Sequence, residues 1–184
     1  MMRDWLDLAR ESVLNPRLGA ARLMLMPLPD AALPLTLALL AVLNGIVYGL
    51  ILSPVVVLSP VLLALISGAI IWLSAWLLTL VGARLGGHGQ FPALLRMVLW
   101  LQAIRLVAQV ALVLLSALVP PLAPMVGMAA GVWGLYMMVC FVTEAHGFPT
   151  RWKAVAALAA VFVLTLVLAS LLVAMIGEPA GLAD

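Results

Sequence analysis

Long uninterrupted runs of apolar residues dominate the chain, and short polar segments separate them. Each run exceeds the roughly 20 residues that a helix needs to cross the ~30 Å hydrocarbon core of a bilayer. The runs lack the alternation of apolar and polar positions that marks the strands of a membrane barrel. Inside lipid each run must satisfy its own backbone hydrogen bonds, which requires a helix. The pattern predicts an all-α, polytopic membrane bundle with five transmembrane helices, at about residues 31–52, 61–83, 97–119, 122–143 and 152–176.

The segments at the two ends of the chain differ from these runs. Residues 1–30 mix charged and apolar positions at helical spacing, with Trp5, Leu8 and Ser12 on one face, and predict an amphipathic helical segment. We expect one of two placements for such a segment. Either it binds the membrane surface or a partner, or it lies against the protein's own cytoplasmic surface. Residues 177–184 form a short polar tail.

Basic residues fall in alternate segments between the spans. The side of the membrane that holds most Lys and Arg is the cytoplasmic one, so we expect a cytoplasmic N-terminus and, with five spans, a C-terminus outside. The turn between the first two spans is predicted at the prolines Pro54 and Pro60. Of the nine basic residues, those on the predicted cytoplasmic side are Arg3, Arg10, Arg17, Arg22, Arg84, Arg96, Arg151 and Lys153.

Composition supports a membrane location. The chain has 184 residues, of which 67% are hydrophobic and 9% charged, against about 25% charged residues in soluble domains. A formal net charge of +2 does not indicate a nucleic-acid-binding protein, which needs an extended basic face. The single cysteine, Cys140, cannot form an intramolecular disulfide. The short chain and its high content of Ala, Leu and Val suggest a bacterial inner-membrane protein.

One span carries a charge that lipid tolerates poorly. Arg105 shares a helix face with Gln102 and Gln109, at i−3 and i+4. One hypothesis is a site for an anionic group, such as a lipid headgroup or a substrate carboxylate. The other is a structural clamp in which Arg105 pairs with Glu144 at the end of the fourth span. Asn44 lies at a similar depth to Gln109, so a hydrogen bond that joins their helices is also expected.

Two pairs of glycines have a spacing that favours close helix contacts. Gly45 and Gly49 form one GxxxG motif, and Gly127 and Gly131 form another. Small residues at this spacing let two helix backbones approach, within one chain or between protomers.

No pattern of catalytic or metal-binding residues emerges. His88, His146 and Glu144 could share the cytoplasmic side, but they lack the local spacing of a zinc site. No serine, threonine or cysteine stands near a histidine and an acid in the manner of an activated nucleophile. The glycine-rich segment 86–90 lacks a phosphate-binding pattern and is predicted to be a flexible turn. We therefore expect a protein without metal, cofactor or enzymatic activity.

The order and spacing of several short motifs resemble the Yip1 domain family of five-span membrane proteins. These motifs are Asn15-Pro16-Arg17 before the first span, Phe91 and Arg96-Met-Val-Leu-Trp100 after a glycine-rich loop, Trp133-Gly-Leu-Tyr136 followed by Glu144-Ala-His-Gly147, and Thr150-Arg-Trp-Lys-Ala154. The resemblance implies a helical bundle with a cytoplasmic N-terminus. Eukaryotic relatives bind small GTPases, but the Asp-Leu-Tyr-Gly-Pro-like stretch of those members is missing here, so GTPase binding is not expected.

Two functions remain open. The first is a non-enzymatic scaffold or accessory subunit that contacts the lipid bilayer and other membrane proteins, or a second copy of itself. The second is a small permease or lipid-handling protein that uses a polar pocket around Arg105.

Overall fold

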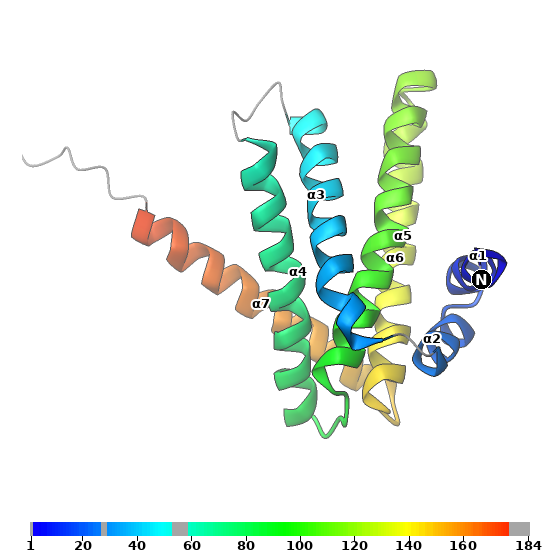
Figure 1. Cartoon of the computed structure of the whole chain (residues 1–184), viewed down its shortest axis with the longest axis vertical. Helices are drawn as coiled ribbons and strands as arrows, with labels where there is room; N and C mark the ends of the chain where they lie inside the picture. Colours follow the sequence, from blue (N-terminus) through cyan, green and yellow to red (C-terminus); the bar gives the residue numbers. More distant parts are fainter. Residues whose placement is uncertain (1, 27–28, 53–58, 177–184) are drawn as a thin grey trace, which may run out of the picture.

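A computed structural model describes residues 2–26, 29–52 and 59–176, and the description below concerns these residues alone. All regular structure in them is helical (Figure 1). The elements are α1 (Met2–Leu14), α2 (Pro16–Leu25), the short 3₁₀ helix η1 (Asp30–Ala32), α3 (Leu33–Leu52), α4 (Pro60–Arg84), α5 (Phe91–Leu118), α6 (Ala123–His146) and α7 (Arg151–Ile176).

The five predicted spans correspond to α3 through α7. Each of these helices is long and apolar enough to cross a membrane. α5 begins at Phe91, six residues before the predicted start at residue 97, because the helix continues past the apolar run and has a proline in its first turn. The predicted turn at Pro54 lies outside the described residues. Pro60 opens α4, and Ser59 caps that helix by accepting a hydrogen bond from the Leu62 amide at 3.2 Å.

The tight packing lies at one end of the bundle. We call it the basic end, because Arg84, Arg96, Arg151 and Lys153 gather there. The buried residues of α4 lie from Ser67 onward and those of α5 between Leu94 and Leu106. Those of α6 lie from Met137 onward and those of α7 between Ala154 and Val161. Residues from all four helices are fully buried there, namely Leu78, Leu94, Met97, Phe141, Val142 and Ala154.

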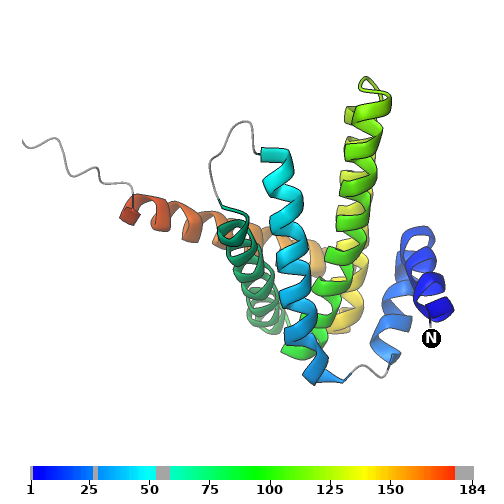
Figure 2. The same cartoon turned by 45° about the horizontal axis from the view of Figure 1, so that its top comes forward.

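In the opposite half of the bundle, which we call the far half, α5 and α6 are open to their surroundings. α5 has no buried residue after Leu106, and α6 has none before Met137. α5 and α6 continue there as a pair that stands apart from α3 and α4, while α7 runs away from the other spans (Figures 1 and 2). In a bilayer the exposed apolar side chains of this half contact lipid or another membrane helix.

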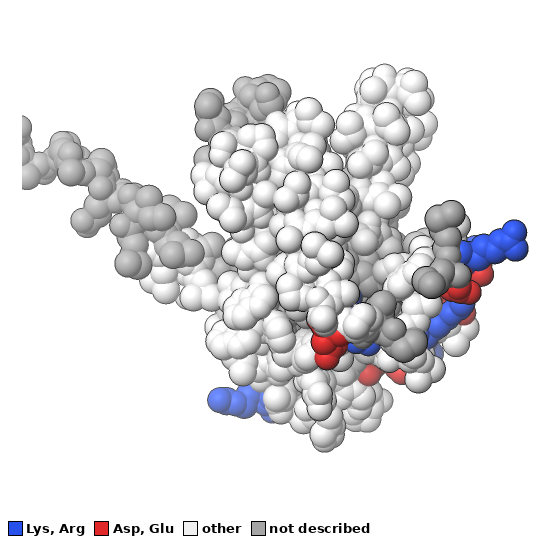
Figure 3. Space-filling view, in the orientation of Figure 1, with Lys and Arg blue, Asp and Glu red and all other residues white. Residues whose placement is uncertain are grey.

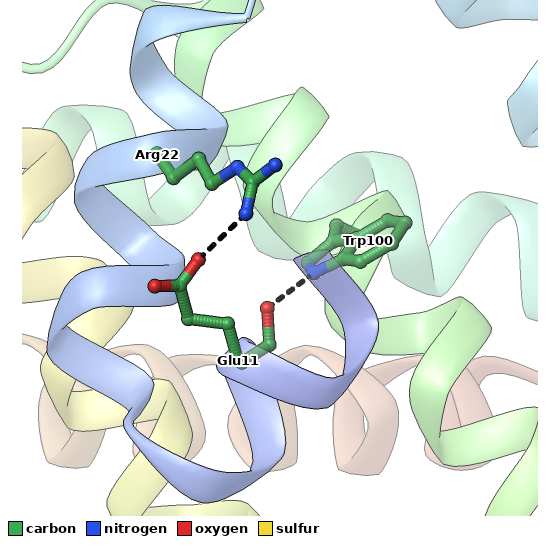
Figure 4. Close-up of polar contacts among 4 residues, drawn as sticks. Glu11, Arg22 and Trp100 are labelled. Atoms are coloured by element: carbon green, nitrogen blue, oxygen red, sulfur yellow. Dashed lines mark hydrogen bonds and ion pairs between the residues drawn. The ribbon is translucent and has the colours of Figure 1, made fainter. Parts of the chain in front are cut away.

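α1 and α2 form a hairpin that packs on the outside of α5 and α6 (Figure 2). The Trp100 indole N–H donates to Ser12 Oγ at 3.0 Å, and the Trp133 indole N–H donates to the Val13 carbonyl at 2.9 Å. Arg22 of α2 pairs with Glu11 of α1 at 3.1 Å (Figure 4). The inner face of the predicted amphipathic segment therefore lies against the protein's own surface, one of the two placements expected.

Apart from Arg105 in α5, the charged residues of the described ranges lie in the hairpin and at the basic end. In the face shown in Figure 3, Lys, Arg, Asp and Glu lie on the lower part of the molecule and on the hairpin, whereas the upper parts of the spans are uncharged. This distribution matches a protein whose spans lie in hydrocarbon.

Candidate functional site

The polar residues of α3 and α5 meet at one place. The Arg105 guanidinium donates to the Tyr48 hydroxyl at 3.0 Å, and the Gln109 side-chain amide donates to the same oxygen at 3.4 Å. Arg105 is exposed, whereas Tyr48 and Gln109 are half-buried. We call these three residues the Tyr48 cluster. It presents a permanent positive charge on the side of an apolar helix pair.

The predicted pair between Arg105 and Glu144 is wrong. The described residues contain no ion pair to Arg105, and Glu144 is exposed on the last turn of α6. Arg105 lies 14 residues from the start of α5, or about 21 Å along the helix, whereas Glu144 is about 3 Å from the end of α6. These two helix ends lie together, since the His88 amide donates to the His146 carbonyl at 3.0 Å. The axial difference is too large for the two side chains to meet.

The predicted hydrogen bond between Asn44 and Gln109 is also not formed. Asn44 is fully buried and donates at 2.8 Å to the Leu40 carbonyl in its own helix, while Gln109 turns to Tyr48. Three buried polar atoms of this region have no hydrogen-bond partner among the described residues: Asn44 Oδ1, Gln102 Nε2 and Gln109 Oε1. Buried polar atoms without a partner are costly, and in membranes they commonly mark functional positions.

Asn44 and Tyr48 are one turn apart on α3, and Gln102, Arg105 and Gln109 share one face of α5. Because Tyr48 contacts two of the three α5 residues, the polar faces of the two helices oppose each other. Four of the five predicted polar residues therefore occupy one interface, and Glu144 does not. Tyr48 was missed from the sequence because a single tyrosine in a span carries no distinctive spacing.

A groove of about 470 Å³ runs along the far half beside this interface. Gln109 lines it together with Leu50, Leu112, Val113 and Ser116. The groove is mostly apolar, with one amide and one hydroxyl.

The two GxxxG motifs have different surroundings. A Cβ on Gly45 would lie 2.6 Å from the Pro60 carbonyl and 2.8 Å from Ala64, so this glycine allows α3 to approach α4 closely. Gly49 lies at ordinary contact distance from Pro60. Gly127 contacts only Leu112, and a Cβ on Gly131 would meet no atom within 4 Å. The first motif packs the bundle internally, and the second leaves an open surface on α6.

The contacts around His146 were also not predicted from the sequence. Its side chain is buried, stacks on Phe148 with ring centroids 4.9 Å apart, and points its two nitrogens at the Val142 and Leu78 carbonyls at 3.1 and 3.2 Å. A Cβ on Gly82 or Gly87 would collide with the imidazole. The segment 86–90, predicted as a flexible turn, therefore packs closely over His146.

Other contacts hold the basic end together. Lys153 of α7 donates to the Leu85 carbonyl at 2.9 Å, just beyond the end of α4. Arg96 of α5 pairs with Asp30 at 3.2 Å and donates to the Met26 carbonyl at 3.4 Å. These bonds connect the loops to the spans. The sequence placed Arg96 and Lys153 among the basic residues of the predicted cytoplasmic side, but their partners could not be predicted.

No group of three or more His, Cys, Asp or Glu side chains in the described parts of the chain could hold a metal ion. His88 and His146 meet through their main chains rather than through their rings. The described residues thus form polar contacts between helices, and they expose apolar surfaces that can contact other helices or lipid.

Five long apolar helices, without strands in the described ranges, define an integral, multi-pass membrane protein. The Yip1 domain family model matches residues 10–172, most of the chain, and the protein belongs to this family. The match includes the α2 segment and all five spans. The searches of curated proteins and of solved structures found no match.

Proposed function

We propose that this protein is a non-enzymatic scaffold or accessory subunit of the bacterial inner membrane, with its N-terminus and basic end in the cytoplasm. It would act through helix–helix contacts in the bilayer and through the surface of its basic end. The partner is another membrane protein or a second copy of the chain.

The observation that carries this proposal is the open glycine surface of α6. A Cβ on Gly131 or Gly134 would meet no atom of another part of the described chain within 4 Å, although glycine in a helix interior costs about 1 kcal/mol relative to alanine. Every residue from Met128 to Tyr136 is exposed. Small residues at this spacing favour close approach of a second helix in a membrane. Within one chain α3 already uses the same motif in that way.

The test is co-purification from native membranes in a mild detergent. Wild-type protein should be recovered with a partner or as an oligomer. Gly131→Leu places a bulky side chain on the glycine surface, at a position where a Cβ meets no other described part of the chain within 4 Å, and should lose that association. Ala129→Leu adds bulk about 160° away around the same exposed helix and should retain it. Wild-type protein recovered only as a monomer without a partner would refute the proposal.

A second candidate function is transport or handling of a lipid or other amphiphile with an anionic group. It is favoured by the exposed Arg105, which has no acidic partner among the described residues, and by the apolar groove beside Gln109. A cation in the membrane stabilises an anionic group strongly when water is scarce.

Phosphatidylglycerol is the probe for this second function. It should raise the thermal stability of the wild-type protein in detergent, and Arg105→Ala should remove that increase while the lipid-free protein keeps its stability. Tyr48→Phe should give a partial loss because it removes only the hydroxyl that holds the guanidinium. If Arg105→Ala unfolds the protein, the arginine is a structural clamp and this function is rejected.

A further inference from the structure

α1 (Met2–Leu14) presents four chemically distinct sides. Residues seven apart differ by about 700°, nearly two full turns, so they share a side of an α-helix. α1 holds six such pairs. Met2 with Ala9 is apolar, Asp7 with Leu14 joins an acid to an apolar residue, and the other four pairs define the sides. These four pairs are aromatic or small polar, apolar, basic and acidic, in that order around the helix: Trp5 with Ser12, Leu6 with Val13, Arg3 with Arg10, and Asp4 with Glu11.

The structure fixes the direction of three of these sides. The Trp5–Ser12 side faces the bundle, because Trp5 packs on Trp100 with ring centroids 5.6 Å apart and Ser12 accepts from the same indole. The acidic side faces α2, because Glu11 pairs with Arg22. α2 leads to the basic end, where Met26 meets Arg96.

The apolar side faces the far half. Val13 and Ala9 line a groove of about 400 Å³ together with Arg10 and Leu14 of α1 and with Ile104 and Val107, which lie farther along α5 than Trp100. Leu6 is 65% exposed and Val13 is 39% exposed, so neither is covered by the chain itself. Arg3 and Arg10 are exposed between the apolar and the acidic sides. From far half to basic end, α1 therefore presents apolar, then basic, then acidic residues.

This order is the order of a membrane leaflet, from acyl chains through phosphates to water. α1 also runs across the spans, being seen nearly end-on in Figure 1 while α5 and α6 stand upright. α5 extends 18 residues beyond Trp100 and 11 beyond Val107, or about 27 and 16 Å. Interfacial helices lie ~5–10 Å into the boundary between headgroups and acyl chains, so the height of α1 fits the surface of the bilayer that the spans cross.

We propose that α1 is a lipid-binding edge of the protein, with Leu6 and Val13 inserted among acyl chains and Arg3 and Arg10 bound to lipid phosphates. The indole N–H groups of Trp100 and Trp133 hold α1, and indoles are enriched at the interfaces of membrane proteins. The acidic residues then lie on the water side, where they do not meet the phosphates. This binding does not depend on the partner-binding surface of α6.

The test uses full-length protein in nanodiscs of phosphatidylcholine with phosphatidylglycerol. A spin label is attached in a Cys140→Ala background at Leu6→Cys, at Val13→Cys, or at Asp7→Cys as the matched control on α1. Labels at positions 6 and 13 should be relaxed by oxygen, which concentrates in lipid, more than by a water-soluble nickel chelate. The label at position 7 should show the reverse. If positions 6 and 13 are relaxed mainly by the nickel chelate, or by neither reagent, α1 lies in water or under protein and the proposal fails.

A double variant, Arg3→Gln with Arg10→Gln, tests whether the two arginines bind lipid phosphates. Because phosphate contacts hold the helix at its depth, the double variant should bring the label at position 13 closer to water, with a smaller oxygen-to-nickel ratio. The label at position 7 reports whether α1 is still helical and in place. An unchanged ratio at position 13 would contradict the role of the two arginines.

Discussion

The basic end and the far half of the bundle are built from the same four helices, yet they differ in almost every contact. At the basic end α4, α5, α6 and α7 bury their side chains together, and His146 and Lys153 connect loops to helices. In the far half α5 and α6 bury no side chain. The basic end carries most of the charged residues of the spans, yet it is the better packed half, so hydrophobicity alone does not explain the difference. The difference lies in glycine positions and in polar contacts that let helices meet.

The largest difference in the free energy of unfolding is expected between two glycines that both lie in apolar helices but have different surroundings. Gly82→Ala places a Cβ in the imidazole of His146 and should cost about 3 kcal/mol or more, since neither backbone nor ring has room to move. Gly131→Ala should be neutral or stabilising by up to about 1 kcal/mol. Unfolding in mixed micelles at increasing denaturing detergent measures both. Equal effects of the two substitutions would erase the contrast between the halves.

A second pair of variants compares two phenylalanines. Phe141 is fully buried at the basic end, whereas Phe162 of α7 is 64% exposed. Phe141→Ala should lower the free energy of unfolding by about 3 kcal/mol because it leaves a cavity. Phe162→Ala should change it by less than about 0.5 kcal/mol. A large loss for Phe162→Ala in the same unfolding assay would mean that α7 packs against the protein in its far half.

The attachment of the N-terminal hairpin should be weaker than the packing of the spans. Ser12→Ala removes the acceptor of the Trp100 indole and leaves that N–H buried, at a cost of about 1–2 kcal/mol. Hydrogen exchange of the α1 amides should therefore become about 5- to 30-fold faster, while the exchange at the basic end stays the same. Ser74→Ala is the control, because its hydroxyl only bonds to its own helix. Unchanged exchange in α1 would show that this hydrogen bond does not hold the hairpin.

The smallest effect is expected for the ion pair on the outside of the hairpin. Arg22 and Glu11 have side chains 40% and 30% exposed, and surface pairs of this kind contribute about 0–1 kcal/mol. Arg22→Gln should lower hairpin stability by no more than that, and by less at high salt. Exchange of α1 at two salt concentrations measures it. A loss as large as that of Ser12→Ala would mean that the charge pair, and not the indole contacts, positions α1.

Hydropathy alone was enough to predict the helical class and the five spans. The predicted bounds differ from α3, α4, α6 and α7 by a few residues, because an apolar run and a membrane helix end for the same reason. α5 starts earlier, at Phe91, since a helix that leaves the hydrocarbon need not stop there. The sides of the membrane on which the termini lie remain a prediction from the basic residues.

The candidate site could be predicted only in part. Helical spacing placed Gln102, Arg105 and Gln109 on one face, which is a property of a single helix. The partners of these residues depend on how helices rotate and cross, and that is decided by packing across the whole bundle. For this reason Tyr48, rather than Glu144, meets Arg105.

The His146 contacts illustrate the same limit. A glycine-rich segment has the same sequence whether it is loose or pressed against another group. Only the structure shows that the side chain of His146, 59 or more residues away, requires Gly82 and Gly87 to lack a Cβ.

The most direct test of the contrast between the two ends is hydrogen exchange at one described loop of each end, in full-length protein in nanodiscs. At the basic end the amides of Gly87 and His88 donate to the Gly82 and His146 carbonyls. At the far end the Leu122 amide closes an exposed turn. After correction for intrinsic rates, Gly87 and His88 should exchange at least about tenfold more slowly than Leu122, because their opening must disrupt the packing on His146. Exchange of Gly87 and His88 as fast as that of Leu122 would contradict a bundle that is closed at its basic end.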